Sequence, residues 1–155
     1  SQMLAEIKRL TEVIGTGSGV PHNGKQLYMQ SCGKCHKLFT AGGEIGPNLT
    51  SFQRQDLQRV LVNVVNPSLE IREGYENYRV ITEDGRVLTG FVVDQDDQLV
   101  VLRGADGQTT ILQRDAIEEI AATPQSLMPE ELLKRLNDQQ VRDLFAFLRS
   151  SQPVP

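Results

Sequence analysis

Residues that bind metals or form cross-links are scarce in this sequence. Its 155 residues include two cysteines, two histidines and three methionines. A zinc site needs about four ligands, usually cysteine or histidine, and only His22 would be left to complete one around the cysteine pair. Long hydrophobic runs are also missing, because the longest clear one, Leu99–Leu102, is far shorter than the roughly 18 residues that cross a membrane. We therefore expect no transmembrane segment in this chain.

Positive charge is in the minority, and the excess of acid is concentrated in one stretch. Residues 1–70 contain seven Lys and Arg against five Asp and Glu, a net charge of +2, and residues 123–155 contain four of each. Residues 71–122 contain five against eleven, a net charge of −6. A basic surface for nucleic acid has no support in this pattern. No acid–base or nucleophilic combination of side chains stands out, so we expect no catalytic residues.

Both cysteines stand in the motif Cys32-Gly33-Lys34-Cys35-His36. Two cysteines separated by two residues and followed by histidine are typical of covalent c-type haem attachment. In a helical turn both sulfurs point to one side and can form thioethers with the haem vinyl groups, while His36 brings its imidazole to the iron. A thioredoxin-like dithiol would normally open a helix after a strand, whereas residues 24–31 already predict a helix. We predict one haem c, attached through Cys32 and Cys35 and ligated by His36, and no disulfide.

Haem is attached to such motifs outside the cytoplasm, so we expect a periplasmic or otherwise extracytoplasmic location. The chain begins with Ser1 and shows no signal peptide. We therefore expect that an export signal has been removed or that the sequence is a piece of a longer exported protein.

Apolar residues at helical spacing predict helices on both sides of the acidic stretch. Residues 1–14 form one, which either joins the chain to something upstream or packs on the same domain. Others are predicted at residues 24–31, at 56–65 before Asn66-Pro67, and at 130–136. A terminal helix opens with a capping box of Asn137 and Gln140. It is expected to bury Val141, Leu144, Phe145, Phe147 and Leu148.

Between these helices the hydrophobic period changes from 3.6 to 2. Strands are predicted at residues 78–82, 86–94, 98–103, 109–113 and 117–120, separated by compact turns. Five meandering strands of this size usually curl into a small barrel, and Gly90 is well placed for the bend.

Outside this β-module, the sequence resembles a class I cytochrome c. Gly24-Lys25-x-x-Tyr28 resembles the N-terminal helix of that family, and Asp143-Leu144-x-Ala146-Phe147-Leu148 resembles its C-terminal helix. The resemblance implies that Gly24 and Tyr28 pack against Leu144 and Phe147.

Gly46-Pro47-Asn48-Leu49 resembles the loop beneath the haem in the same family. The resemblance implies that the Pro47 carbonyl accepts a hydrogen bond from Nδ1 of His36, and that Leu49 packs on the porphyrin. Such a bond would orient the imidazole and strengthen it as a ligand.

Met128 is the candidate for the second axial ligand. It lies 92 residues after His36, a gap that falls to 46 when residues 76–121 are set aside. From the residues alone, a core methionine is an equally good interpretation, and the resemblance favours ligation. His22 is a weaker alternative, and Met29 is expected to be a packing residue.

The whole combination resembles a more particular family, the haem-binding domain of Planctomycetes and Verrucomicrobia. The residues that carry the likeness are Asn66-Pro67-Ser68, Gly74-Tyr75-x-x-Tyr78, Asp84-Gly85-Arg86, Gly90 and Ser126-Leu127-Met128-Pro129. The predicted fold class is α+β, a mostly α cytochrome c fold with a small inserted antiparallel β-barrel of about five strands. The predicted domains are a helix and linker at 1–21, the cytochrome c domain at 22–75 and 122–155, and the β-module at 76–121.

The resemblance implies one-electron transfer by a His/Met-ligated haem c. The partners would be redox proteins or a dehydrogenase domain fused to this one in a larger exported protein. Two alternatives stay open: an open distal site that binds a gas or peroxide, and a β-module that binds a partner while the haem stores an electron. Lys25, Lys34 and Lys37, near the attachment site, form either a solvated face or a docking rim.

Overall fold

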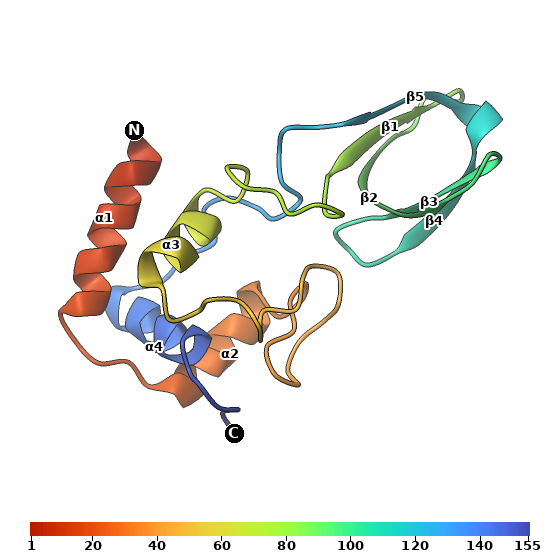
Figure 1. The fold of residues 1–155 in the computed structure, drawn as a ribbon. Helices are drawn as coiled ribbons and strands as arrows, with labels where there is room; N and C mark the ends of the chain where they lie inside the picture. Colours follow the sequence, from red (N-terminus) through yellow and green to blue (C-terminus); the bar gives the residue numbers. More distant parts are fainter. The chain divides into compact units, whose positions relative to one another are not determined.

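The computed structural model describes residues 1–155 and shows an α+β protein, as predicted (Figure 1). The chain forms two compact units: unit 1 is Ser1–Asn66 with Glu130–Pro155, and unit 2 is Pro67–Pro129. Unit 2 therefore interrupts unit 1, and the chain crosses between them after Asn66 and after Pro129. The β-module expected at residues 76–121 lies inside unit 2. None of the helices has the length and hydrophobicity that crossing a membrane would require.

Unit 1 contains the helices α1 (Gln2–Gly15), α2 (Pro21–Ser31), α3 (Leu57–Val65) and α4 (Asp138–Leu148). Local sequence sets where they begin. The side chains of Ser1 and Asp56 accept backbone N–H groups at the starts of α1 and α3, and Pro21 opens α2 without leaving an unpaired donor. The capping box of Asn137 and Gln140 at the start of α4 is confirmed.

α2 and α4 cross closely because Gly24 has no side chain. A Cβ at this position would lie 1.9 Å from the carbonyl oxygen of Asp143, so only glycine permits this approach. The ring of Tyr28 lies 5.1 Å from that of Phe147, at an interplanar angle of 56°. The predicted crossing of these two helices is confirmed.

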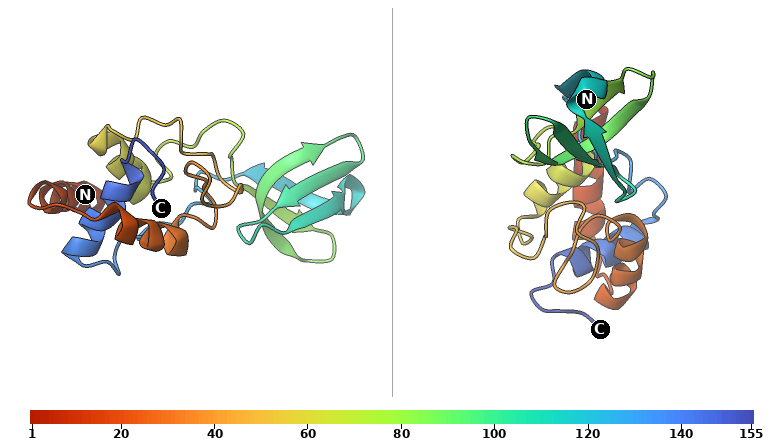
Figure 2. Two further views of the ribbon diagram at one scale, coloured as in Figure 1. Left: turned by 90° about the horizontal axis from the view of Figure 1, so that it is seen from below. Right: turned by 90° about the vertical axis from the view of Figure 1, so that its right-hand side faces the viewer.

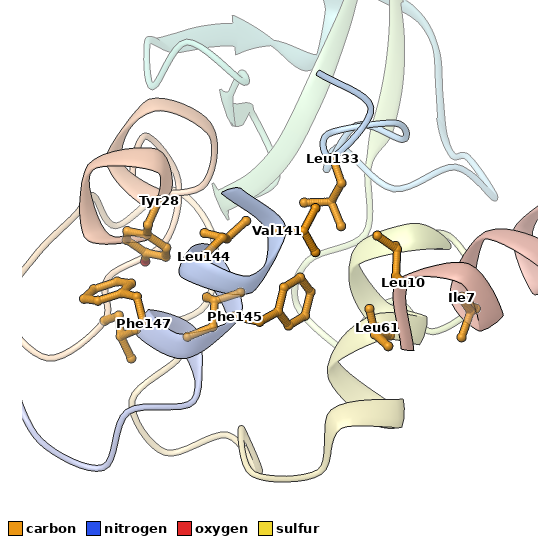
Figure 3. Close-up of a cluster of buried hydrophobic side chains, with 11 residues drawn as sticks. Ile7, Leu10, Tyr28, Leu61, Leu133, Val141, Leu144, Phe145 and Phe147 are labelled. Carbon is orange, nitrogen blue, oxygen red and sulfur yellow. The ribbon is translucent and has the colours of Figure 1, made fainter. Parts of the chain in front are cut away.

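The core of unit 1 joins α4 to the other three helices (Figure 3). Phe145 and Phe147 of α4 are buried with Leu61 of α3. Leu10 of α1 is completely buried in the same cluster, with Ile7 beside it. Of the two roles left open for the first helix, the structure shows packing on the same domain.

The prediction of a short helix at residues 130–136 is wrong. This segment is a turn, with hydrogen bonds from Lys134 N to Glu131 O and from Leu136 N to Leu133 O. Glu131 has φ = +66°, a left-handed conformation that an α-helix cannot include. Leu133 is buried in the unit 1 core, and this burial accounts for the apolar pattern that resembled a helix.

Unit 2 is a five-stranded antiparallel sheet with the order β4-β3-β2-β1-β5. The strands are β1 (Tyr78–Thr82), β2 (Val87–Gln95), β3 (Leu99–Arg103), β4 (Thr109–Gln113) and β5 (Ile117–Ala122), with a 3-10 turn, Arg114–Ala116, before β5. β5 returns to pair with β1, and Tyr78 lies opposite Ala122. The predicted strands are thus present, and the chain enters and leaves the sheet at the same end.

The sheet curls but does not close, so the predicted barrel is wrong in this respect. β4 and β5 are the two edges and do not pair with each other. The curl, visible in Figures 1 and 2, brings Val80 of β1 together with Leu102 of β3 and Leu112 of β4 in a separate small core. A register shift in β2 between Val92 and Asp94 bends the strand. Closure needs matching tilt and stagger along every strand, which strand count alone does not determine.

Candidate haem-attachment site

The attachment motif is a compact turn that continues directly from α2. The backbone N–H groups of Cys32 and Gly33 both donate to the carbonyl of Tyr28, at 2.7 Å each. Those of Cys35 and His36 both donate to the carbonyl of Cys32, at 3.1 and 2.9 Å. The last turn of α2 thereby holds both cysteines and the histidine within one short, hydrogen-bonded segment.

Both thiols are free rather than joined in a disulfide. Burial raises the pKa of Cys32 to about 11, and burial also raises the pKa of Cys35. A reactive dithiol of the thioredoxin type instead has a thiol whose pKa is lowered. The two groups are therefore S–H groups at neutral pH, in the form that adds across a vinyl group to give a thioether.

The imidazole of His36 is held by the loop that follows. Its Nδ1 lies 2.7 Å from the carbonyl oxygen of Pro47, the hydrogen bond that the resemblance implied. Because a carbonyl only accepts, the proton is on Nδ1 and the lone pair is on Nε2, where a metal can bind. Burial lowers the pKa of His36, which favours this neutral form.

Gly46 allows the loop to lie against this ring. A Cβ on Gly46 would be 2.8 Å from Cε1 of His36 and 3.0 Å from Nδ1. The loop is also tied to the motif by backbone hydrogen bonds from Gly46 to Cys35 at 2.6 Å and from Leu49 to Lys37 at 2.8 Å. The sequence identified Gly46 only as part of a loop motif, and its contact with the imidazole becomes visible in the structure.

The carbonyl of His36 has its own partner, which sequence reasoning missed. The hydroxyl of the fully buried Tyr28 donates to this oxygen at 2.5 Å. Tyr28 was expected only to pack between α2 and α4, as Figure 3 shows with Phe147. Gly42, at φ = +115°, passes so close that a Cβ would lie 2.0 Å from the same oxygen. No spacing rule links residues 28, 36 and 42, so only the fold reveals this arrangement.

The remaining candidates are distributed over both units. Leu49 is partly buried against the core of unit 1, whereas Met128 belongs to an irregular loop of unit 2. His22 is exposed on the first turn of α2, and its Nδ1 lies 2.8 Å from the carbonyl of Pro155. Met29, expected to be a packing residue, is 42% exposed, and its sulfur would lie 2.8 Å from a Cβ on Gly33, so the rest of its side chain packs on the attachment turn.

Two of the three lysines near the attachment site, interpreted as either a solvated face or a docking rim, have partners within unit 1. Lys37 forms an ion pair of 2.7 Å with Glu44, and Lys25 donates to the carbonyl of Val154. Lys34, within the attachment motif, is exposed. It is therefore the lysine most available to another molecule.

The donor set of the site fits haem rather than a bare metal ion. No group of three or more His, Cys, Asp or Glu side chains is placed to hold a metal by itself. A haem iron receives four ligands from the porphyrin and needs only one or two from the protein. One imidazole with a free Nε2, next to two free thiols, meets that requirement.

This arrangement fits a site for covalent haem attachment. Residues 21–89 match the family model described as Cytochrome c. The match begins with α2 and covers the attachment motif, His36 and Pro47, and it ends before Met128 and α4. It supports a c-type cytochrome domain, with covalently bound haem c and electron transfer based on that haem. Among curated proteins, none matches this chain.

Proposed function

We propose that this chain transfers single electrons through one haem c, attached through Cys32 and Cys35 and ligated by His36 and Met128. The hydrogen bond from Nδ1 of His36 to the Pro47 carbonyl carries the proposal. Bound haem supplies a reversible one-electron couple at its iron. The protein's part is to hold the imidazole in one tautomer and one orientation, so that electron transfer requires little rearrangement.

Ligation of the iron by Met128 is the more specific part of the proposal. Met128 belongs to an irregular loop in which a side chain can be presented to a metal, and it stands two residues before the chain returns to unit 1. A thioether opposite an imidazole favours ferrous iron and raises the reduction potential.

We further propose an extracytoplasmic electron-transfer domain rather than an enzyme, of the class I type found in Planctomycetes and Verrucomicrobia. A redox protein, or a dehydrogenase domain in the same polypeptide, would supply or accept the electron. Support comes from the match to the Cytochrome c family and from the motif residues of unit 2, including Asp84-Gly85-Arg86 and Gly90.

Two measurements test this function. Haem should remain on the polypeptide after denaturation and acid–organic extraction, because thioethers are covalent. A colourless polypeptide with free haem in the solvent would refute the attachment. The optical spectrum should then show the weak ferric band at the red end of the visible range that accompanies His/Met ligation, and a redox titration should give a one-electron couple.

The alternative of an open distal site is decided by the same spectrum. Five-coordinate ferric haem lacks the weak red band and binds small ligands readily. Met128→Ala should keep the covalent haem, lose the band and lower the potential. An unchanged spectrum in this variant would exclude Met128 as the ligand.

A further inference from the structure

Two serines connect the Met128 loop to the segment by which the chain enters unit 2. The backbone N–H of Met128 donates to the hydroxyl oxygen of Ser126 at 3.1 Å. The backbone N–H of Ser126 donates in turn to the hydroxyl oxygen of Ser68 at 2.9 Å. Both hydrogen bonds are partly buried, so water competes for them only in part.

The two hydrogen bonds differ in how far apart their partners lie in the sequence. Ser126 to Met128 is a local contact of the kind that serine makes in turns, two residues along the chain. Ser68 to Ser126 joins residues 58 positions apart. A local turn shapes the loop, whereas only the long-range bond holds the loop in register with another segment.

These two hydrogen bonds, here called the serine relay (Ser68, Ser126 and Met128), lie close to the points where the chain passes between unit 1 and unit 2. Ser68 is the second residue after Asn66, where the chain leaves unit 1, and Met128 is the second residue before Glu130, where it returns. Beside the relay, the N–H of Thr123 donates to the carbonyl of Asn77 at 2.8 Å and extends the pairing of β5 with β1. The outgoing and returning segments are therefore bonded to each other at Asn77 and Thr123 and again at Ser68 and Ser126, two residues before Met128.

We propose that Ser68 and Ser126 are positioning residues that preset the Met128 loop for iron ligation. This inference rests on the proposed ligation by Met128. The two hydrogen bonds then determine how often the thioether of Met128 is available to the iron. Without the relay the loop samples more conformations, and the ligating fraction falls in proportion.

The test compares ligand competition in the haem-loaded, full-length protein. Imidazole added to the ferric form displaces a thioether, so its apparent affinity reports how firmly Met128 is held. Ser126→Ala and Ser68→Ala should each tighten apparent imidazole binding by roughly threefold to tenfold, the effect of one lost hydrogen bond. Both should also lower the reduction potential and weaken the red band.

Matched variants separate positioning from general loosening of the loop. Ser126→Thr and Ser68→Thr keep the hydroxyl and should restore most of the wild-type affinity for imidazole. Thr123→Val removes a hydroxyl of the same loop that bonds to the Gln125 carbonyl and not to the relay, and it should change little. Equal effects from Thr123→Val and Ser126→Ala would overturn the proposal.

Met128→Ala distinguishes failure of this inference from failure of the proposed function. If Met128→Ala opens the iron to imidazole while both serine-to-alanine variants bind it like the wild type, the relay does not position the ligand. If Met128→Ala itself changes nothing, the ligation fails and the relay proposal falls with it.

Discussion

At the scale of single residues, the site depends on groups that are not themselves haem ligands. The Pro47 carbonyl determines which nitrogen of His36 carries the proton, and the Tyr28 hydroxyl holds the backbone of the same residue. Gly46 leaves the space that the imidazole occupies. Together they orient the ring in advance, so that ligation costs less conformational entropy.

Gly46→Ala should disturb His36 ligation. The added Cβ would lie 2.8 Å from Cε1 of the ring, so either the ring or the loop must move. We expect a loss of about 1–3 kcal/mol in the free energy of unfolding, as in other overpacked sites. The optical spectrum should also show a larger five-coordinate or misligated fraction.

Pro47→Ala is the comparison for this prediction. The bond to Nδ1 comes from the main-chain carbonyl, which alanine keeps, so its spectrum should stay close to wild type. A normal spectrum in Gly46→Ala, or a stronger change in Pro47→Ala, would contradict the role given to Gly46.

At the scale of elements, caps and close approaches decide where helices begin and how they meet. The capping box at Asn137 starts α4, and the left-handed Glu131 prevents the helix expected before it. Gly24 lets α2 reach α4 at the end opposite to the attachment motif. The position of the attachment motif therefore depends on a helix crossing about two turns before Cys32.

Gly24→Ala tests this crossing. Alanine favours a helix over glycine by about 1 kcal/mol, so helix propensity alone would stabilise the variant. A Cβ 1.9 Å from the Asp143 carbonyl should instead separate the helices and destabilise unit 1 by about 3 kcal/mol or more. Denaturant unfolding followed by circular dichroism measures the change.

Gly15→Ala, at the end of α1, is the matched control. Nothing lies within 4 Å of a Cβ at Gly15, so this variant should be neutral or slightly stabilising. Equal stability of both variants would show that α2 and α4 do not need the close approach.

At the scale of the whole molecule, each unit has a hydrophobic core of its own. The core of unit 1 includes Leu10, Tyr28 and Phe147, and that of unit 2 is centred on Val80, Leu102 and Leu112. The negative charge is also divided unevenly, because residues 71–122 carry eleven acidic against five basic side chains. These features predict separable folding and a polarised charge distribution.

Removing the sheet should leave a cytochrome that still attaches haem. Asn77 and Thr123 are hydrogen-bonded across the base of the sheet, so a short Gly/Ser link can replace residues 78–122 without strain. Ser68, Ser126 and Met128 all remain. We expect soluble protein with covalent haem, measured by haem staining of a denaturing gel. Absence of any soluble haem protein would show that unit 2 is needed to complete unit 1.

Lys34→Glu should slow electron transfer from an acidic redox protein at low salt. Lys34 is the exposed lysine of the attachment motif, and steering by such a charge acts mainly on the association rate. We expect the second-order rate constant of the variant to be lower than that of the wild type by roughly twofold to tenfold. The difference between the two proteins should shrink as added salt shortens the screening length to about 8 Å.

Lys8→Glu, on α1, makes the same change in net charge away from the motif and should have a smaller effect. If neutralising Asp94, Asp96 and Asp97 slows the reaction instead, unit 2 is the docking surface. The hypothesis that the β-module binds the partner would then be the better one.

The sequence by itself determined whatever depends on neighbours along the chain. Short spacings between residues predict four features: the attachment motif, the Asn137 capping box, the contact surfaces of α2 and α4, and the five strands with their turns. Tertiary structure alone decided the open sheet, the turn at residues 131–136 and the packing of α1 on unit 1. It also decided the contacts of His36 with Tyr28 and Gly46, and the bond between Ser68 and Ser126. The physical reason is that strand tilt, left-handed backbone and contacts between distant segments arise from packing the whole chain, which local periodicity does not encode.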